Sequence, residues 1–188
     1  LVVHPPVSVA RDFIDYPYVA DLGAVQLAAV LERTLGAAQI DLVDAYALPG
    51  AGLAWRPDGR ARLGALPADL LAAIADDAAL AVVVAYTPFH RPPRRDDLLG
   101  DLLAGVRARW PAAAVILADC YQSGQHHVAA DGRDVLASYP EADAYVQYEA
   151  ERTVPALLQA LLERGERPRG VHRGEQPDLD DLPAPAWR

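Results

Sequence analysis

The densest run of side chains that could do chemistry begins at Asp119 and Cys120 and ends at His126 and His127. Thiolate and imidazole groups are ligands that transition metals favour, so this run is a candidate metal site. Adjacent histidines in one loop do not readily face a single ion, and no second cluster of ligands follows in the sequence. The alternative is a solvated loop in which Cys120 packs as a small apolar group.

Several common kinds of site are excluded by what the sequence lacks. A single cysteine cannot build an internal disulfide, a four-thiolate zinc site or an iron–sulfur cluster. All 17 basic residues are arginine, so neither a Walker-A loop nor a lysine Schiff base can form. The serines, Ser8, Ser123 and Ser138, lie in no Gly-x-Ser-x-Gly elbow. The run 50–52, Gly-Ala-Gly, lacks both the place and the third glycine of a dinucleotide fingerprint.

Two carboxylates stand where an apolar run gives way to an amphipathic one. Glu149 and Glu151 follow Tyr148 and precede the last helical pattern of the chain. Carboxylates near a helix N-terminus complement the helix dipole, and that structural role explains them sufficiently. Their place at the end of a predicted strand also makes them candidates for a binding loop.

Apolar runs alternate with amphipathic runs along the chain, which is typical of a three-layer α/β fold with a mainly parallel sheet. The periodicity predicts a five-stranded sheet, with strands over 1–4, 39–44, 80–86, 113–118 and 144–148. It predicts helices over 20–35, 67–77, 94–110, 133–138 and 150–164. Right-handed crossovers would place the loops that follow the strands at one edge of the sheet, where such folds bind ligands.

Length and composition fit one ordinary domain. The chain has 188 residues, of which 52% are hydrophobic, and we assign the domain to residues 1–165. Residues 166–188, rich in Arg, Gly, Pro and Asp, read as an extended linker. A formal net charge of −9 argues against nucleic-acid binding. No apolar run reaches the roughly 20 residues of a membrane span and no secretory leader is visible, so we expect a cytoplasmic protein. The sequence begins at Leu1, already inside an apolar strand-like run, and we therefore expect it to be a piece of a longer protein.

Taken together, these features resemble the N-terminal cobalamin-binding-type domain of class B radical SAM enzymes, which include anaerobic cyclases related to the Mg-protoporphyrin ester cyclase. The resemblance covers nearly the whole chain. It rests on the strand leading into Pro5-Pro6, the helix over 23–31, Asp44, the loop with Gly124 and His126, the run Tyr148-Glu149-Ala150-Glu151, and the final Leu179-Asp180-Asp181-Leu182-Pro183-Ala184-Pro185-Ala186-Trp187.

The resemblance implies a flavodoxin-like (Rossmann-like) domain that holds a corrinoid at the carboxyl edge of its sheet. In the family, the final segment leads into a barrel that binds a [4Fe–4S] cluster through Cys-x-x-x-Cys-x-x-Cys and cleaves S-adenosylmethionine. This chain lacks that cysteine triplet, so alone it cannot perform the radical reaction. The expected partners are therefore the corrinoid and the radical SAM barrel of the same full-length chain, with no nucleic acid and no membrane.

A corrinoid has broad apolar faces and a rim of amides, so it needs a wide cleft with small residues and scattered donors. The loops that follow the predicted strands supply such residues. The candidates are Pro5, Pro6, Val7, Ser8, Thr87, Pro88, Ser123, Gly124, Gln125, His126, Tyr148, Glu149 and Ala150.

Two departures from the family bear on this reading. The Asp-x-His-x-x-Gly motif, whose histidine coordinates cobalt in methionine-synthase-type domains, does not follow the first strand. Family members also carry Gly-Glu-x-Glu after the fifth strand, whereas this chain has Tyr148 in place of that glycine. One alternative is an unrelated flavodoxin-like or nucleotide-sugar-binding domain. The stronger alternative is a domain that kept the fold but lost the cofactor. It would recognise a small-molecule or peptide substrate through Tyr121, Tyr148, the paired histidines and Arg91, Arg94 and Arg95.

Overall fold

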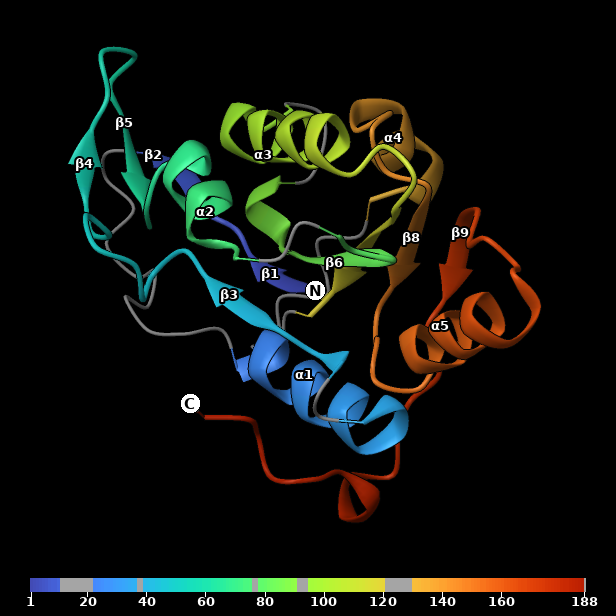
Figure 1. The fold of residues 1–188 in the computed structure, drawn as a ribbon. Helices are drawn as coiled ribbons and strands as arrows, with labels where there is room; N and C mark the ends of the chain where they lie inside the picture. The colour runs from blue at the N-terminus through green and yellow to red at the C-terminus, as the bar shows by residue number, and fades with distance from the viewer. Residues whose placement is uncertain (11–21, 37–38, 76–77, 91–94, 121–129, 188) are drawn as a thin grey trace.

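The computed structural model describes residues 1–10, 22–36, 39–75, 78–90, 95–120 and 130–187. Helices and strands alternate through most of the chain (Figure 1). The strands are β1 Val2–His4, β2 Val7–Ala10, β3 Leu42–Asp44, β4 Ala54–Trp55, β5 Arg60–Leu63, β6 Ala81–Tyr86, β7 Ala114–Asp119, β8 Ala144–Gln147 and β9 Gly170–Arg173. The helices are α1 Leu22–Leu35, α2 Pro67–Ala73, α3 Asp97–Arg109, α4 Gly132–Ser138 and α5 Thr153–Arg164, with 3₁₀ turns η2 Pro88–His90 and η4 Leu179–Asp181.

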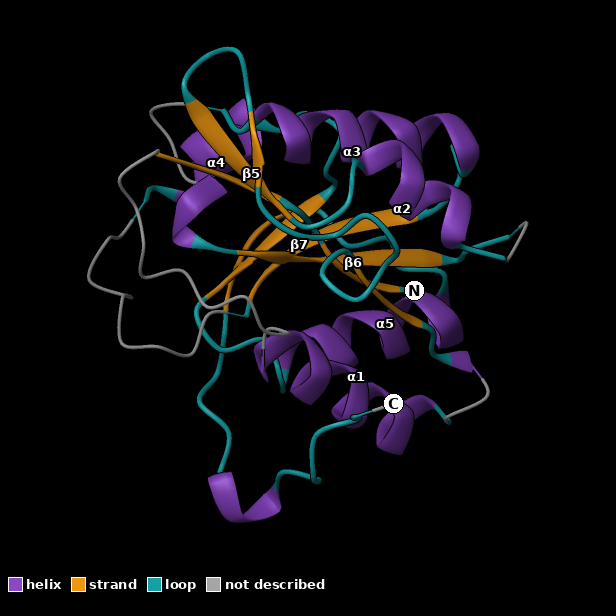
Figure 2. Cartoon of the chain, turned by 90° about the vertical axis from the view of Figure 1, so that its left-hand side faces the viewer, coloured by secondary structure: helices purple, strands orange, loops and turns teal. Residues whose placement is uncertain are grey.

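The main sheet has the strand order β3-β1-β6-β7-β8-β9, and every neighbouring pair is parallel. Helices α1 and α5 cover one face, while α2, α3 and α4 cover the other (Figure 2). The predicted three-layer α/β fold with a mainly parallel sheet is therefore confirmed. The chain order reverses between β1 and β6, and in open α/β sheets the carboxyl edge at such a switch point is where ligands bind.

Successive side chains along the buried strands point to opposite faces of the sheet, and each face has its own hydrophobic core. Val83 on β6 and Ile116 on β7 face α1 and α5, whereas Val82 and Val115 face α2, α3 and α4. All six residues of β6, and all six of β7, are buried. Strands that are apolar on both faces are what a sheet covered by helices on both sides requires.

The sheet contains one strand more than the sequence predicts. Strand β9 lies within the segment assigned to a linker and pairs with β8 from Ala144↔Gly170 to Gln147↔Arg173. Its pattern gave no signal, because Val171 is its one large apolar residue and the strand is mostly exposed at the edge. Backbone pairing and charge hold it in place instead of apolar burial.

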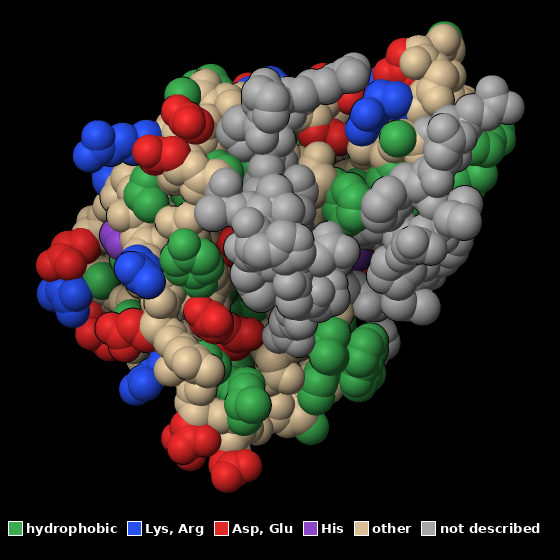
Figure 3. Space-filling model, turned by 180° about the vertical axis from the view of Figure 1, so that it is seen from behind, with side chains coloured by type: hydrophobic (Ala, Val, Ile, Leu, Met, Phe, Trp, Pro, Cys, Tyr) green, Lys and Arg blue, Asp and Glu red, His purple; other side chains and the backbone are tan. Residues whose placement is uncertain are grey.

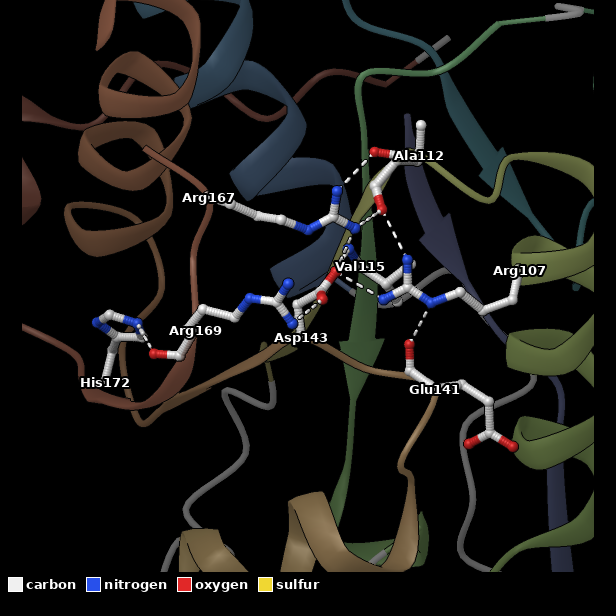
Figure 4. A network of polar contacts seen from close by, with 9 residues as sticks. Arg107, Ala112, Val115, Glu141, Asp143, Arg167, Arg169 and His172 are labelled. Atoms are coloured by element: carbon white, nitrogen blue, oxygen red, sulfur yellow. Dashed lines mark hydrogen bonds and ion pairs between the residues drawn. The ribbon is translucent and has the colours of Figure 1, made fainter. Parts of the chain in front are cut away.

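The chain leading into β9 is fixed by the carboxylate of Asp143, whose side chain is only 5% exposed (Figure 4). Arg107 Nη2 on α3 lies 2.6 Å from Asp143 Oδ2, and Arg167 Nη2 lies 2.9 Å from the same oxygen. Arg169 Nη1 donates to Asp143 Oδ1 at 2.8 Å, and the backbone N–H of Val115 donates to Oδ2. This network ties α3, β7, β8 and the start of β9 together at the amino edge of the sheet.

A second, antiparallel sheet stands where the sequence analysis predicts loops. Strand β2 pairs with β5 from Val7↔Leu63 to Ala10↔Arg60, and β5 pairs with β4. Its inner face is small, consisting of Val7, Val9, Ala61 and Leu63. The prediction failed here because these strands are two to four residues long, which is too short for a clear periodic signal.

After β9, the chain runs along the outside of α1 as an extended stretch, residues 174–187, here called the exit segment (Figure 1). Gln26 Nε2 on α1 donates to Pro183 O at 2.9 Å, and the N–H of Ala186 donates to Val25 O at 3.2 Å. Arg33 donates to Asp181 O. The exit segment is therefore held to α1 through residues 181–186.

Within the described part of the chain, no helix has the length and apolar character that a membrane crossing requires. On the face shown in Figure 3, acidic and basic side chains are interspersed with apolar ones, and the arginines visible there do not gather into a single patch.

Candidate functional site

The carboxyl edge of the main sheet carries a hollow of about 330 Å³ beside the ends of β7 and β8. Side chains from four parts of the fold line it: α1, the ends of β7 and β8, the turn into α5, and the exit segment. They are Gln26, Asp119, Cys120, Tyr148, Glu149, Glu151, Gln176, Pro177, Leu179 and Leu182. The volume falls within the usual range for small-molecule sites, and the edge is the one where this fold class binds ligands.

Of the three predicted residues that follow β8, two line the hollow and one does not. Tyr148 and Glu149 line it, whereas Ala150 is buried in the core beneath α1 and α5. The predicted residues Ser123, Gly124, Gln125 and His126 lie outside the described residues, as does His127 of the candidate metal run. Within the described ranges, no group of three or more His, Cys, Asp or Glu side chains could hold a metal ion.

The predicted residues that follow β1 do not line the hollow. Pro5, Pro6, Val7 and Ser8 are all buried. Ser8 belongs to β2, where its Oγ accepts from Arg60 Nε at 2.7 Å and from Arg56 Nη1 at 3.3 Å. Its N–H donates to Asp96 Oδ2 at 3.1 Å. The second sheet therefore covers this loop and uses its polar atoms.

The two predicted residues after β6, Thr87 and Pro88, likewise do not line the hollow and instead belong to the packed structure around η2. Thr87 is fully buried and Pro88 begins η2. The N–H of Thr87 donates to His90 Nδ1 at 3.2 Å, so the His90 proton resides on Nε2, which faces Pro6 O at 3.4 Å. Burial lowers the pKa of His90, because an apolar interior disfavours the charged imidazolium; the nearby Asp96 carboxylate opposes this in part.

Tyr148 has an unusual backbone conformation at the rim of the hollow. Its φ is 70°, and it is the one non-glycine residue with positive φ among those that the structure describes. Such a conformation costs roughly 1–2 kcal/mol for a residue with a Cβ, and glycine adopts it freely. Its ring lies against Arg173, whose Cζ is 5.5 Å from the ring centroid. The backbone at this position therefore favours glycine over a residue with a side chain.

Asp119 connects the ends of β7 and β8. Its side chain is buried, and its Oδ2 lies 3.3 Å from the hydroxyl of Tyr145 and 3.4 Å from the backbone nitrogen of Tyr148. Next to it, the backbone of Cys120 lies so close to α1 that a Cβ on Gly23 would sit 1.6 Å from Cys120 O. The rim of the hollow is therefore fixed by close backbone packing between α1 and β7.

A pair that the sequence analysis missed lies at the same edge, at the ends of β1 and β3. His4 and Asp44 are direct register partners, and His4 Nδ1 lies 2.8 Å from Asp44 Oδ1. The imidazole stacks on Tyr46, with ring centroids 4.7 Å apart and planes 9° from parallel. His4 is 1% exposed, and its Nε2 has no hydrogen-bond partner among the residues described. The sequence did offer one indication of this pair, because each of the two predicted strands ends on a polar residue.

The arrangement places a hollow with carboxylate and thiol groups, a strained tyrosine and a buried histidine–carboxylate pair along one edge of the sheet. In comparisons with known proteins, no protein-family model, curated protein or solved structure matches this chain.

Proposed function

We propose that this chain is the cobalamin-binding domain of a B12-dependent radical SAM enzyme and holds a corrinoid at the carboxyl edge of its main sheet. The full-length enzyme would act in the cytoplasm, with the exit segment leading into a barrel that carries the [4Fe–4S] cluster and binds S-adenosylmethionine. This chain would bind and orient the corrinoid and would not itself catalyse the radical reaction.

The observation that carries the proposal is the hollow beside Asp119 and Tyr148. It lies at the edge where a doubly wound sheet binds ligands, and its rim contains Tyr148 with a φ of 70°. Strained backbone at the rim of a hollow is typical of ligand-binding sites. Because the resembled family has glycine at this position, the left-handed conformation of Tyr148 supports the resemblance independently of residue identity.

The residues present also fit the chemistry of a corrinoid. Leu179, Leu182 and the ring of Tyr148 offer apolar surface to a macrocycle face, while Gln26 and Glu149 offer polar groups to its amide rim. When bound, a corrinoid would supply a redox-active cobalt centre, and the side chains of this edge would orient it and limit its contact with water.

A cofactor-free substrate-recognition domain is the second candidate, and the lining of the hollow favours it in one respect. Asp119, Glu149 and Glu151 all contribute to the lining, and together they would attract a cationic group of a peptide or small molecule. Tyr148 would then supply apolar contact to that substrate instead of to a corrin.

Retention of a corrinoid tests the proposal. The purified chain is mixed with hydroxocobalamin and passed through a desalting column, and the protein fraction is examined for corrin absorbance. We expect a retained corrin band and a raised melting temperature, because a ligand that binds the native state stabilises it. Colourless protein with an unchanged melting temperature would instead support the substrate-recognition domain.

A matched pair of variants locates the site. Glu149→Trp places a bulky ring at the hollow and should abolish retention. Glu163→Trp introduces the same ring at an exposed position near the C-terminal end of α5, and because crossover helices run antiparallel to the strands, that position is at the opposite edge. Equal retention by both variants would place the bound corrinoid away from the hollow.

A further inference from the structure

A second cavity, here called the amino-edge cavity, lies at the edge of the main sheet opposite the hollow beside Asp119. Its volume is about 140 Å³. Leu1, Asp41 and Leu80 contribute to its lining, and they directly precede β1, β3 and β6, three parallel strands of that sheet. The described residues that line it include none of those that line the hollow. The two cavities are therefore separate.

The wall of the amino-edge cavity is apolar, and both hydrophobic cores contribute to it. Leu31 of α1 and Val83 of β6 belong to the core beneath α1 and α5, whereas Ile74 and Trp110 belong to the core on the other face. All four side chains are buried, whereas Leu80 at the rim is 54% exposed. The cavity thus opens to solvent at one end and reaches buried side chains of both cores at the other.

One polar atom of the buried wall has no partner. Nε1 of Trp110 is buried and forms no hydrogen bond with the residues that the structure describes. The indole nitrogen can only donate, and an unpaired buried donor keeps its desolvation cost, so native proteins nearly always pair such a group. The missing partner is an acceptor atom, and a ligand in the cavity that Trp110 borders would bring one.

The indole ring is held in position by the protein itself. Arg109 Cζ lies 4.6 Å from the centroid of the Trp110 ring. The same guanidinium donates to Leu71 O at 2.5 Å and to Ile74 O at 2.8 Å, at the C-terminal end of α2. The donor therefore does not need to be ordered by the ligand, which lowers the entropic cost of binding.

The size and the charge of the amino-edge cavity indicate the class of ligand. An apolar cavity of roughly 150 Å³ binds benzene, so this cavity accommodates one six-membered ring. The Asp41 carboxylate is exposed at the rim, where its charge disfavours an anion. The single unpaired donor, that of Trp110, calls for a single acceptor.

We propose that the amino-edge cavity binds a neutral molecule of the size of a substituted benzene, whose acceptor atom receives the hydrogen bond of Trp110 Nε1–H. The apolar ring of the ligand would pack against Leu31, Val83 and Ile74. This site lies at the opposite edge from the proposed corrinoid site and does not rest on the proposed function.

Nuclear magnetic resonance of the nitrogen-15-labelled chain tests the proposal, with benzyl alcohol as the probe. The chain has three tryptophans, and Trp110→Phe identifies the indole N–H signal of Trp110 by its loss. We expect that proton signal to move downfield saturably as benzyl alcohol is added, because a new hydrogen bond deshields the proton. Trp55 and Trp187 are 58% and 62% exposed, so their signals serve as internal references and should stay in place.

Two further probes test the chemistry of the ligand. Toluene has the ring without an acceptor and should not move the Trp110 proton downfield. Benzoate has the ring with a negative charge and should give no saturable shift. A downfield shift with toluene equal to that with benzyl alcohol would overturn the hydrogen bond, and benzoate binding as tightly as benzyl alcohol would overturn the assignment to neutral ligands.

A matched pair of variants locates the binding site. Ala79→Leu enlarges a half-buried side chain of the lining, and we expect it to weaken benzyl alcohol binding by roughly tenfold or more. Ala68→Leu makes the same change at an exposed position of α2 and should leave the affinity unchanged. The melting temperature of each variant without the probe confirms that it is folded.

The titration of the unchanged protein decides the matter even if a variant does not fold. Absence of a saturable shift of the Trp110 signal, or equal movement of the Trp55 and Trp187 signals, would overturn the proposal. Equal affinity of the two folded variants would show that benzyl alcohol binds elsewhere and would overturn it as well. The corrinoid site, at the other edge, is tested separately by retention of hydroxocobalamin.

Discussion

The backbone nitrogen of Tyr148 lies 3.4 Å from Asp119 Oδ2, at the point where the chain takes a left-handed turn with a φ of 70°. The contact joins the ends of the two strands that border the hollow. A tyrosine is thus held where glycine would be unstrained, and the buried Asp119 carboxylate is one of the groups that hold it.

Substitution at Tyr148 should reveal that strain. Tyr148→Gly and Tyr148→Ala both remove the ring and its contact with Arg173, but only alanine keeps a Cβ in the left-handed conformation. We expect the glycine variant to be more stable than the alanine variant by about 1 kcal/mol. Urea unfolding of the two variants measures the difference. An alanine variant as stable as the glycine variant would show that the backbone at this position is unstrained.

The Asp143 network should be essential for docking of β9. Asp143→Asn keeps the shape of the side chain but leaves Arg107, Arg167 and Arg169 without their shared carboxylate, so we expect a loss of about 3 kcal/mol in the free energy of unfolding. Proteolysis of the segment around Arg169 should accelerate in parallel.

Glu166→Gln is the matched control for Asp143→Asn. Glu166 pairs with Arg164 in an exposed ion pair that water screens, so its loss should leave stability unchanged. If Asp143→Asn is as stable as this control, the network does not anchor the edge strand.

Acidification should destabilise the protein through His90. Burial lowers the pKa of His90 in the native state. Below the pKa of about 6.5 that a histidine has in the unfolded chain, the unfolded chain therefore binds a proton that the native state does not bind. The contribution of His90 to the free energy of unfolding is therefore complete above that pH. As the pH decreases further, the contribution decreases with a slope approaching about 1.4 kcal/mol per pH unit.

Urea unfolding of the wild type and His90→Asn at pH 7.5 and pH 5.5 isolates this contribution. The variant should lose less stability than the wild type between the two values. An equal loss in both proteins would assign the pH dependence to other groups. The carboxylates with lowered pKa values, Asp97, Glu141 and Asp143, lose their contribution in a separate range, as the pH falls below about 4.

The exit segment should be latched to α1 by Gln26. Gln26→Ala removes the hydrogen bond to Pro183 O, whose net contribution is about 1 kcal/mol, so opening should become roughly fivefold more frequent. A protease that cleaves before aspartate reports the opening at Asp178, Asp180 and Asp181. Gln39→Ala, a change outside the segment's contacts, should leave the cleavage rate unchanged. A Gln26→Ala rate equal to that of the control would show that the hydrogen bond does not hold the segment.

Long periodic patterns predicted the fold well, because burial between helices forces a regular sequence. The run 80–86 is apolar on both faces and became β6, and the helical pattern over 20–35 became α1. Strand β9 escaped prediction because it is held by backbone pairing and by arginines on Asp143, neither of which leaves an apolar pattern. The strands of the second sheet were missed for a different reason: at two to four residues each, they are too short to give a clear periodic signal.

The candidate site was predicted less completely than the fold. Tyr148 and Glu149 were found because they directly follow a recognisable strand. His4 and Asp44 were missed because their pairing depends on the register between β1 and β3, which the sequence does not state. The Pro5–Ser8 loop was expected at the open edge, but the second sheet, unseen in the sequence, covers it.

Equilibrium dialysis of the purified chain against hydroxocobalamin tests the central claim most directly. Corrin absorbance on the protein side should rise with concentration and saturate near one corrinoid per chain, and Glu149→Trp should eliminate that saturable binding. Equal corrin absorbance on both sides of the membrane at every concentration would contradict a cobalamin-binding domain.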